Sequence, residues 1–313
     1  MSSYVHIAAP IFKTSATRGQ FDVVLGETRT TLQGLRGMGV DLVVMCEGVE
    51  AFAQTLDTAE TMDDPGPLLN MYQEEAVALN AHIAASVKIR EGDRVYNSQV
   101  FVSPEGALLG VYHKCNLTVG EIDLGLSPGE KAVTIETSIG RLGGIICFDL
   151  NFRWLLEEYK AQLPDILCFG SMYHGSKMVQ GMWAFECRSF LAAGLPVYDG
   201  GIVTPHGEVI DPTHRENPCA HAHVNLDRAL LHYDFNHMKF QEIRLKYGKE
   251  VRLEIPPHFA TALLYSESSQ RTAADICNEF ELELLDDYFD RSLKRNATAR
   301  GSLSQQRSDM EDK

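Results

Sequence analysis

An apolar run that ends in a cysteine is the feature that most constrains this chain. Residues 142–146 are Leu, Gly and Ile, and Cys147 follows them at the start of the segment Cys-Phe-Asp. Such a run is typical of a buried strand, and the next residues, 150–162, have the pattern of a helix. The sequence therefore predicts an α/β fold with a thiol at a sharp strand-to-helix turn, where a nucleophile is held rigidly at an exposed tip.

Two further predicted strands end in charged residues. Glu47 follows the predicted strand 41–46 (Asp-Leu-Val-Val-Met-Cys), and Lys114 follows 111–113 (Val-Tyr-His). Cleavage of an amide by a thiol needs a base that takes the thiol proton and later activates water, and a fixed positive group that holds the oxyanion. Glu47 is the candidate base, and Lys114 with the backbone N–H of Phe148 is the candidate oxyanion site. These strand ends predict a hydrolase whose nucleophile is Cys147.

Composition limits the possible partners. The 313 residues carry a formal net charge of -15, which argues against nucleic acid and anionic membranes because both attract positive charge. No apolar run approaches a membrane span, and the N-terminus lacks the regions of a secretory signal. Seven cysteines without a C-x-x-C pair are typical of reduced thiols. We therefore expect a cytoplasmic protein that acts on a small molecule.

Strands and helices alternate along most of the chain. The patterns predict strands at 4–10, 41–46, 82–87, 95–102, 107–111, 132–136, 142–146, 165–170, 196–203, 208–210 and 221–226, and helices at 20–38, 67–79, 150–162 and 176–193. Many neighbouring strands are joined by short turns, which favours layered mixed sheets over a purely parallel sheet. The length permits one large domain or two ordinary ones. No linker interrupts the first 270 residues, so we expect one domain over 1–293.

The C-terminal residues have a different pattern. Apolar residues at 280, 284, 285, 288 and 289 predict an amphipathic extension helix over 280–293, which is a candidate for docking on a partner subunit. Residues 294–313 are rich in Ser, Gln, Arg and Asp, and this composition predicts a disordered tail.

The sequences around the three strand ends resemble the nitrilase, or carbon–nitrogen hydrolase, superfamily. Residues 44–47 (Val-Met-Cys-Glu) resemble its glutamate motif, 112–117 (Tyr-His-Lys-Cys-Asn-Leu) its lysine motif and 143–152 (Gly-Gly-Ile-Ile-Cys-Phe-Asp-Leu-Asn-Phe) its cysteine motif. The resemblance covers residues 5–228. It implies a four-layer α-β-β-α sandwich of the nitrilase type and a homodimer or higher homo-oligomer built by stacking the sandwiches. It also implies that no metal or organic cofactor is needed.

The resemblance also assigns roles to single residues. It implies a second carboxylate at Glu121, in the loop after the lysine motif, which positions the substrate and assists proton transfer. It further implies a buried structural role for Glu186. Met172 and Tyr173 follow the strand that comes after the catalytic turn, and together with Asn116 they are the candidate substrate-binding residues.

Some positions depart from the family pattern. Residues 151–154 are Asn-Phe-Arg-Trp where the family often has Arg-Phe-Pro-Glu, and Trp183 stands where Arg is common. The pair Cys147-Phe148 is neither the Cys-Trp-Glu of true nitrilases nor the Cys-Cys of some aliphatic amidases. An amide or carbamoyl substrate is therefore preferred over a nitrile.

The sequence predicts a cysteine-dependent amidohydrolase that cleaves a small linear, non-peptide C–N bond through a thioester. One alternative is an N-carbamoyl amidohydrolase or a nitrilase. An alternative of another class is a catalytically silent interaction protein that keeps the fold and binds partners through its C-terminal region. The complete set of Glu47, Lys114 and Cys147 argues against this last alternative.

Overall fold

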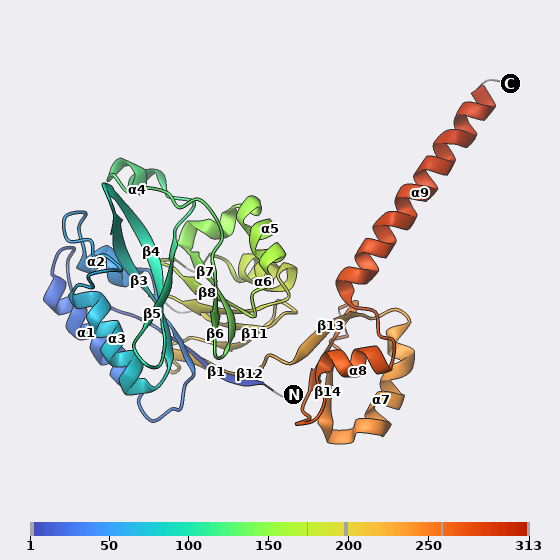
Figure 1. The fold of residues 1–313 in the computed structure, drawn as a ribbon, viewed down its shortest axis with the longest axis horizontal. Coiled ribbons are helices and arrows are strands. Elements are labelled where there is room, and N and C mark those ends of the chain that lie inside the picture. The colour runs from blue at the N-terminus through green and yellow to red at the C-terminus, as the bar shows by residue number, and fades with distance from the viewer. Residues whose placement is uncertain (1–2, 174, 197–199, 258, 312–313) are drawn as a thin grey trace. The chain divides into compact units, whose positions relative to one another are not determined.

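The computed structural model describes residues 3–173, 175–196, 200–257 and 259–311, which form two compact units (Figure 1). The N-terminal unit comprises Tyr4–Val224, and the C-terminal unit comprises Ser3 and the chain from Asn225 onward. This division differs from the single domain expected over 1–293. Residues after Asn225 build a sheet and an apolar core of their own, and that explains the division.

Two six-stranded mixed sheets form the centre of the N-terminal unit (Figure 1). The first sheet has the strand order β12 (Cys219–Asn225), β1 (Tyr4–Pro10), β2 (Leu42–Val44), β3 (His82–Glu91), β4 (Arg94–Val102) and β5 (Leu108–His113). The second has the order β11 (Val209–Pro212), β10 (Gly201–Val203), β9 (Phe190–Gly194), β8 (Ile166–Gly170), β7 (Gly140–Ile146) and β6 (Thr134–Thr137). In each sheet three central strands are parallel and their outer neighbours are antiparallel, so the two halves repeat one pattern.

Helices cover the outer face of each sheet (Figure 1). The first sheet carries α1 (Phe21–Gln33) and α3 (Pro67–Leu79), and the second carries α5 (Arg153–Gln162) and α6 (Lys177–Glu186). Short elements follow the strand ends, namely α2 (Gly48–Ala53), α4 (Val119–Asp123) and the 3-10 turn η1 (Cys147–Asn151). Strands of the two sheets pack face to face. The expected four-layer α-β-β-α sandwich is thus confirmed.

Glycines allow the two sheets to approach closely where β2 ends. A Cβ atom on Gly194 would lie 2.5 Å from the carbonyl oxygen of Val44, and one on Gly170 would lie 2.9 Å from that of Met45. Real Cβ atoms do not come this close to backbone oxygens, so only glycine fits at these positions. The close approach brings the residues after β2 next to the ends of β8 and β9.

The helix expected over 176–193 is wrong in its second half. The helix α6 ends at Glu186, Arg188 has a positive φ of 57°, and Phe190–Gly194 form the fully buried strand β9. A short apolar run that is buried on both faces has no strand periodicity, and its pattern therefore did not separate it from the preceding helix.

The C-terminal unit is built around a three-stranded antiparallel sheet in the order β13-β15-β14. Its elements are β13 (Arg228–His232), η2 (Asn236–Lys239), α7 (Phe240–Tyr247), η3 (Gly248–Glu250), β14 (Val251–Glu254), β15 (Thr261–Ser266), α8 (Ala273–Glu279) and α9 (Leu285–Glu311). The extension helix expected at 280–293 begins at Leu285. It continues through residues expected to form a disordered tail, many of which (Lys, Arg, Ala, Gln) are good helix formers. Across the described residues, every helix is too short or too polar to cross a membrane.

Candidate active site

Cys147 lies at the point where β7 passes into η1. Its backbone is in the left-handed region, with a φ of 47°, a conformation that costs free energy for residues other than glycine. The side chain is 7% exposed. Burial and the negative charge of Glu47 raise the pKa of Cys147 to about 12, although Lys114 and a hydrogen bond with Ser171 act in the opposite direction. The thiol is therefore protonated at neutral pH and needs a base before it can attack.

Lys114 directly follows β5 and is fixed by its backbone. Its N–H donates to the carbonyl of Asn97 over 2.8 Å, and its carbonyl accepts from the N–H of Gly129 over 2.8 Å. The ammonium is 1% exposed and donates to Glu47 Oε1 at 2.8 Å and to both carboxylate oxygens of Glu121 at 2.9 Å. Burial lowers the pKa of Lys114, but the charges of Glu47 and Glu121 outweigh it, so the pKa is raised and the ammonium stays charged.

Glu47 comes shortly after β2 and is 4% exposed. Its Oε1 accepts from Lys114 and, at 2.8 Å, from the side-chain amide of Asn97. Its Oε2 accepts from the backbone N–H of Met172 at 3.0 Å, and the carboxylate also forms a hydrogen bond with the thiol of Cys147. The Glu47 carboxylate is thus held from both sheets, with the Cys147 thiol beside it.

Glu121 lies on α4, where it forms a capping box with Thr118. Its Oε2 accepts from the backbone N–H and the hydroxyl of Thr118, both at 2.8 Å. Its Oε1 accepts from Lys114 and from Asn97, each at 2.9 Å. Burial raises the pKa of Glu121, but Lys114 and these hydrogen bonds outweigh it and lower the pKa. Sequence analysis placed Glu121 in this cluster through resemblance alone, and the geometry brings it there.

Sequence analysis missed two residues of the site. Asn97 on β4 donates to both Glu47 and Glu121, and the hydroxyl of Ser171, just after β8, is a hydrogen-bond neighbour of Cys147. The signal for Asn97 was present, because Asn-Ser-Gln at 97–99 interrupts an otherwise apolar strand and all three residues are buried. Polar residues are rarely buried unless a specific partner binds them.

The three candidate substrate-binding residues lie in different surroundings. Met172 is half-buried and contributes its backbone N–H to Glu47, so it borders the site. Tyr173 is 40% exposed, and its hydroxyl accepts from the side chain of Asn151 at 3.2 Å. The side-chain amide of Asn116 donates to Asp149 at 3.0 Å and accepts from the indole of Trp154 at 3.1 Å. Because both ends of its side-chain amide bind other residues of the protein, these contacts favour a role for Asn116 in holding the loop that contains Lys114 over a role in binding substrate.

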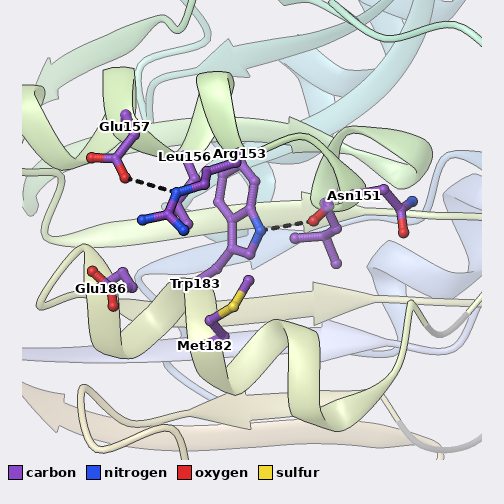
Figure 2. A pocket seen from close by; sticks show the side chains of 8 residues that line it. Asn151, Arg153, Leu156, Glu157, Met182, Trp183 and Glu186 are labelled. Carbon is purple, nitrogen blue, oxygen red and sulfur yellow. Dashed lines mark hydrogen bonds and ion pairs between the residues drawn. The ribbon is translucent and has the colours of Figure 1, made fainter.

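A pocket of about 130 Å³ lies beside η1 but does not contain the cluster of Glu47, Lys114 and Cys147 (Figure 2). Trp183 forms one wall, and its indole N–H donates to the carbonyl of Leu150 at 2.9 Å. Glu186 lines the pocket, is partly exposed and pairs with Lys160. The expectation that Glu186 is a buried structural residue is wrong, because α6 ends at this residue and leaves its carboxylate at the surface.

The structure brings four of the predicted residues together, namely Glu47, Lys114, Glu121 and Cys147, and they define a class of site. A protonated thiol lies beside a carboxylate that can take its proton, and an ammonium lies near both, where strands of the two packed sheets end. This arrangement can attack a carbonyl carbon and stabilise the negative charge that develops on its oxygen.

The chain itself belongs to the carbon–nitrogen hydrolase family, part of the nitrilase superfamily. Residues 16–194 match the family model for carbon-nitrogen hydrolase, which is more than half of the chain. The resemblance found in the three motifs is confirmed by this match.

Curated relatives and solved structures agree with this family. The chain is 26% identical over 197 residues to a chloroplastic omega-amidase of Arabidopsis thaliana. The match covers 53% of this chain and about half (53%) of that relative. It is 23% identical over 228 residues to an omega-amidase of Danio rerio (64% of this chain, 82% of the relative). Nit3 of Saccharomyces cerevisiae has the same fold, with a TM-score of 0.62 at 16% identity over 79% of this chain and 95% of that one. A CN-hydrolase superfamily protein of Xanthomonas campestris, solved with an arsenic adduct in its active site, gives a TM-score of 0.61 at 21% identity over 78% and 95%.

Proposed function

We propose that this protein is a cysteine-dependent amidohydrolase that cleaves a small linear, non-peptide C–N bond. The observation that carries the proposal is the Lys114 ammonium, which binds Glu47 and Glu121 together and lies beside the Cys147 thiol. The family membership and the omega-amidase relatives support the same reaction class.

In the proposed reaction Glu47 takes the thiol proton while the sulfur of Cys147 attacks the carbonyl carbon. The oxyanion is held by the ammonium of Lys114 and the backbone N–H of Phe148. Glu47 then gives its proton to the leaving nitrogen, so ammonia or an amine departs and a thioester remains. Water, deprotonated by Glu47, attacks the thioester, and the carboxylic acid leaves as the thiol is restored.

Glu121 has a positioning part in this scheme, because it binds Lys114 through both carboxylate oxygens. Met172 and Tyr173 are proposed to border the substrate. We further propose a cytoplasmic location, consistent with seven unbridged cysteines, and an assembly of two or more copies. Neither of these two points enters the chemistry.

The first test is Cys147→Ala, assayed for ammonia release on short amides, carbamoyl compounds and nitriles. We expect activity to fall at least about 10⁴-fold, because the nucleophile is lost, while the thermal unfolding curve stays close to that of the parent. Cys277→Ala is the matched control, since Cys277 is similarly buried at 6% exposure but lies in the C-terminal unit. Undiminished hydrolysis by Cys147→Ala would rule the mechanism out.

A second candidate function is a carbamoyl-specific activity, favoured by the 24% identity over 215 residues to a citrullinase of Francisella tularensis (61% of this chain, 73% of the relative). Product analysis by mass spectrometry separates the two activities, since only a carbamoyl substrate releases carbon dioxide. Absence of turnover on every compound, with no selective alkylation of Cys147 by iodoacetamide, would favour the catalytically silent alternative.

A further inference from the structure

Asp149, two residues after the nucleophile, is fully buried and has four hydrogen-bond donors around it. Its Oδ1 accepts from the backbone N–H of Asn116 at 2.8 Å and from the side-chain amide of Asn116 at 3.0 Å. Its Oδ2 accepts from the hydroxyl of Tyr112 at 2.7 Å and from the backbone N–H of Ile146 at 3.2 Å. Both oxygens are thus saturated, although Asp149 makes no contact with a reacting atom in the proposed reaction.

The residues that supply these donors lie close to Lys114 and Cys147 along the chain. Tyr112 comes two residues before Lys114, and Asn116 comes two residues after it, whereas Ile146 directly precedes Cys147. The strand β5, which Lys114 directly follows, belongs to the first sheet, and η1, which begins with Cys147, extends from the second. The Asp149 carboxylate therefore joins the segment around Lys114 (residues 112–116), at the end of one sheet, to the turn at Cys147, at the end of the other.

The bond to Ile146 also bears on the backbone of the nucleophile. Cys147 has a φ of 47°, a conformation that persists in a residue with a side chain only where surrounding contacts enforce it. The N–H of Ile146 is held by Asp149 from the far side of Cys147, which closes the turn around the strained residue.

We propose that Asp149 is a positioning residue that fixes both the left-handed backbone of Cys147 and the spacing between the Cys147 sulfur and the Lys114 ammonium. The catalytic consequence rests on the proposed function, but the positioning itself does not.

The chemistry of the donors explains why this position needs a carboxylate. An amide in its place has one oxygen and one NH₂ group, so one pair of donors would face another donor instead of an acceptor. Either the backbone N–H of Asn116 or that of Ile146 would then lose its partner inside the core, and an unsatisfied buried donor is costly. Burial raises the pKa of Asp149 to about 6, against the effect of its hydrogen bonds to Tyr112 and Asn116 and of the nearby Lys114 charge. The carboxylate is thus ionised at neutral pH, as the four donors require.

The experiment compares Asp149→Asn and Tyr112→Phe with Tyr159→Phe. Tyr159 is a suitable control because it is another fully buried tyrosine whose hydroxyl bonds backbone carbonyls near β7 and does not bond Asp149. Three properties are measured: the thermal unfolding midpoint, the rate at which iodoacetamide alkylates Cys147 (followed by mass spectrometry), and kcat with KM on an amide that the parent hydrolyses.

We expect the two tyrosine variants to lose similar stability. Only Asp149→Asn and Tyr112→Phe should slow alkylation of Cys147 and lower kcat, each by about tenfold to a hundredfold, with KM changed much less. If Asp149→Asn does not fold, Tyr112→Phe against Tyr159→Phe decides the matter.

Two results would overturn the proposal. One is a folded Asp149→Asn with parental alkylation rate and kcat, and the other is equal loss of both in Tyr112→Phe and Tyr159→Phe. A third result separates the two proposals. If the parent protein hydrolyses no amide but Tyr112→Phe, unlike Tyr159→Phe, slows alkylation of Cys147, the positioning role is supported and the proposed function is contradicted.

Discussion

Two lysines are buried against glutamates in the N-terminal unit, and they differ in how many carboxylates they bind. Lys88 on β3 pairs with the carboxylate of Glu50 on α2 and donates to the Glu50 carbonyl at 3.1 Å. Lys114 binds two carboxylates, those of Glu47 and Glu121. Both lysines are buried, at 7% and 1% exposure, so each needs a negative partner to be stable there.

The difference lies in the charge that remains after pairing. One carboxylate neutralises Lys88, so the Lys88–Glu50 pair has no charge left for chemistry. The cluster around Lys114 has two carboxylates for one ammonium and the Cys147 thiol as a neighbour, so it carries one negative charge in excess. A buried lysine–glutamate pair is therefore not a sign of catalysis by itself. The excess carboxylate beside a protonated thiol is the feature that supplies a base.

The largest expected effect comes from removing each lysine charge in turn. Lys114→Met should lower kcat/KM by about 10²–10³-fold or more, because an oxyanion donor is lost. Lys88→Met should leave the activity per folded molecule within a few fold of the parent. Both variants should lose about 3–5 kcal/mol of unfolding free energy, since each leaves a buried carboxylate without its partner. Activity on short amides and urea unfolding would be measured on the same preparations.

The control for this pair is the parent protein, and each measured activity is divided by the fraction of folded molecules in its sample. Equal losses of activity per folded molecule in the two variants would erase the distinction between the clusters. Such a result would show that the loss in Lys114→Met does not come from an oxyanion donor that Lys88 lacks.

A smaller effect is expected when one carboxylate in each cluster becomes an amide. Glu121→Gln weakens the charged hydrogen bonds to Lys114, so kcat should fall by about tenfold to a hundredfold, the equivalent of one such bond. Glu50→Gln should change kcat much less, because among the described residues the Glu50 carboxylate pairs with Lys88 and makes no hydrogen bond to Lys114. Steady-state kinetics on one amide, with circular dichroism to verify folding, provides the comparison. A larger loss in Glu50→Gln than in Glu121→Gln would contradict it.

Much of the site was predictable from sequence because its residues end predicted strands. Glu47, Lys114 and Cys147 each follow a predicted strand. The strands β2 and β7, which precede Glu47 and Cys147, belong to the central parallel strands of their sheets, whereas Lys114 follows the edge strand β5. Resemblance was needed for Glu121, which sits on a short helix in a connecting loop. Asn97 and Ser171 were missed as site residues, and Asp149 as a positioning residue, because their partners lie far from them along the chain. Examples are Glu47 for Asn97 and Tyr112 for Asp149.

The fold was predictable where strands alternate with turns and less so elsewhere. The helix α3 begins and ends at Pro67–Leu79 as expected, because proline fixes its first turn and Asn80 ends it in the left-handed conformation. The strand β9 was taken for helix because it is apolar on both faces. The elements of the C-terminal unit between 228 and 279 were not predicted at all. Its core forms only through contacts among distant segments, such as β13 with β15.

The smallest expected effect is a difference in how the two clusters respond to pH. Burial raises the pKa of Glu50 and outweighs Lys88, whereas Lys114 and the hydrogen bonds lower the pKa of Glu121 in spite of burial. The folded protein therefore holds the Glu50 proton more tightly than the unfolded chain does, so the Glu50 contribution to stability falls as pH rises above about 4.5. The folded protein holds the Glu121 proton less tightly, and that contribution is present above about 4.5 and is lost as pH falls below it.

Unfolding free energies measured by urea at several pH values between about 3.5 and 6.5 test these opposite signs. The parent minus Glu50→Gln should give a difference that declines with rising pH, and the parent minus Glu121→Gln one that increases, mainly at the acidic end. Taking differences removes the contribution of carboxylates that lie far from the substituted residue, because these titrate alike in the parent and the variant. If the two differences changed in the same direction with pH, the two glutamates would have equivalent surroundings. The excess negative charge would then belong to neither cluster in particular, and the argument that it makes Glu47 available as a base would lose its support.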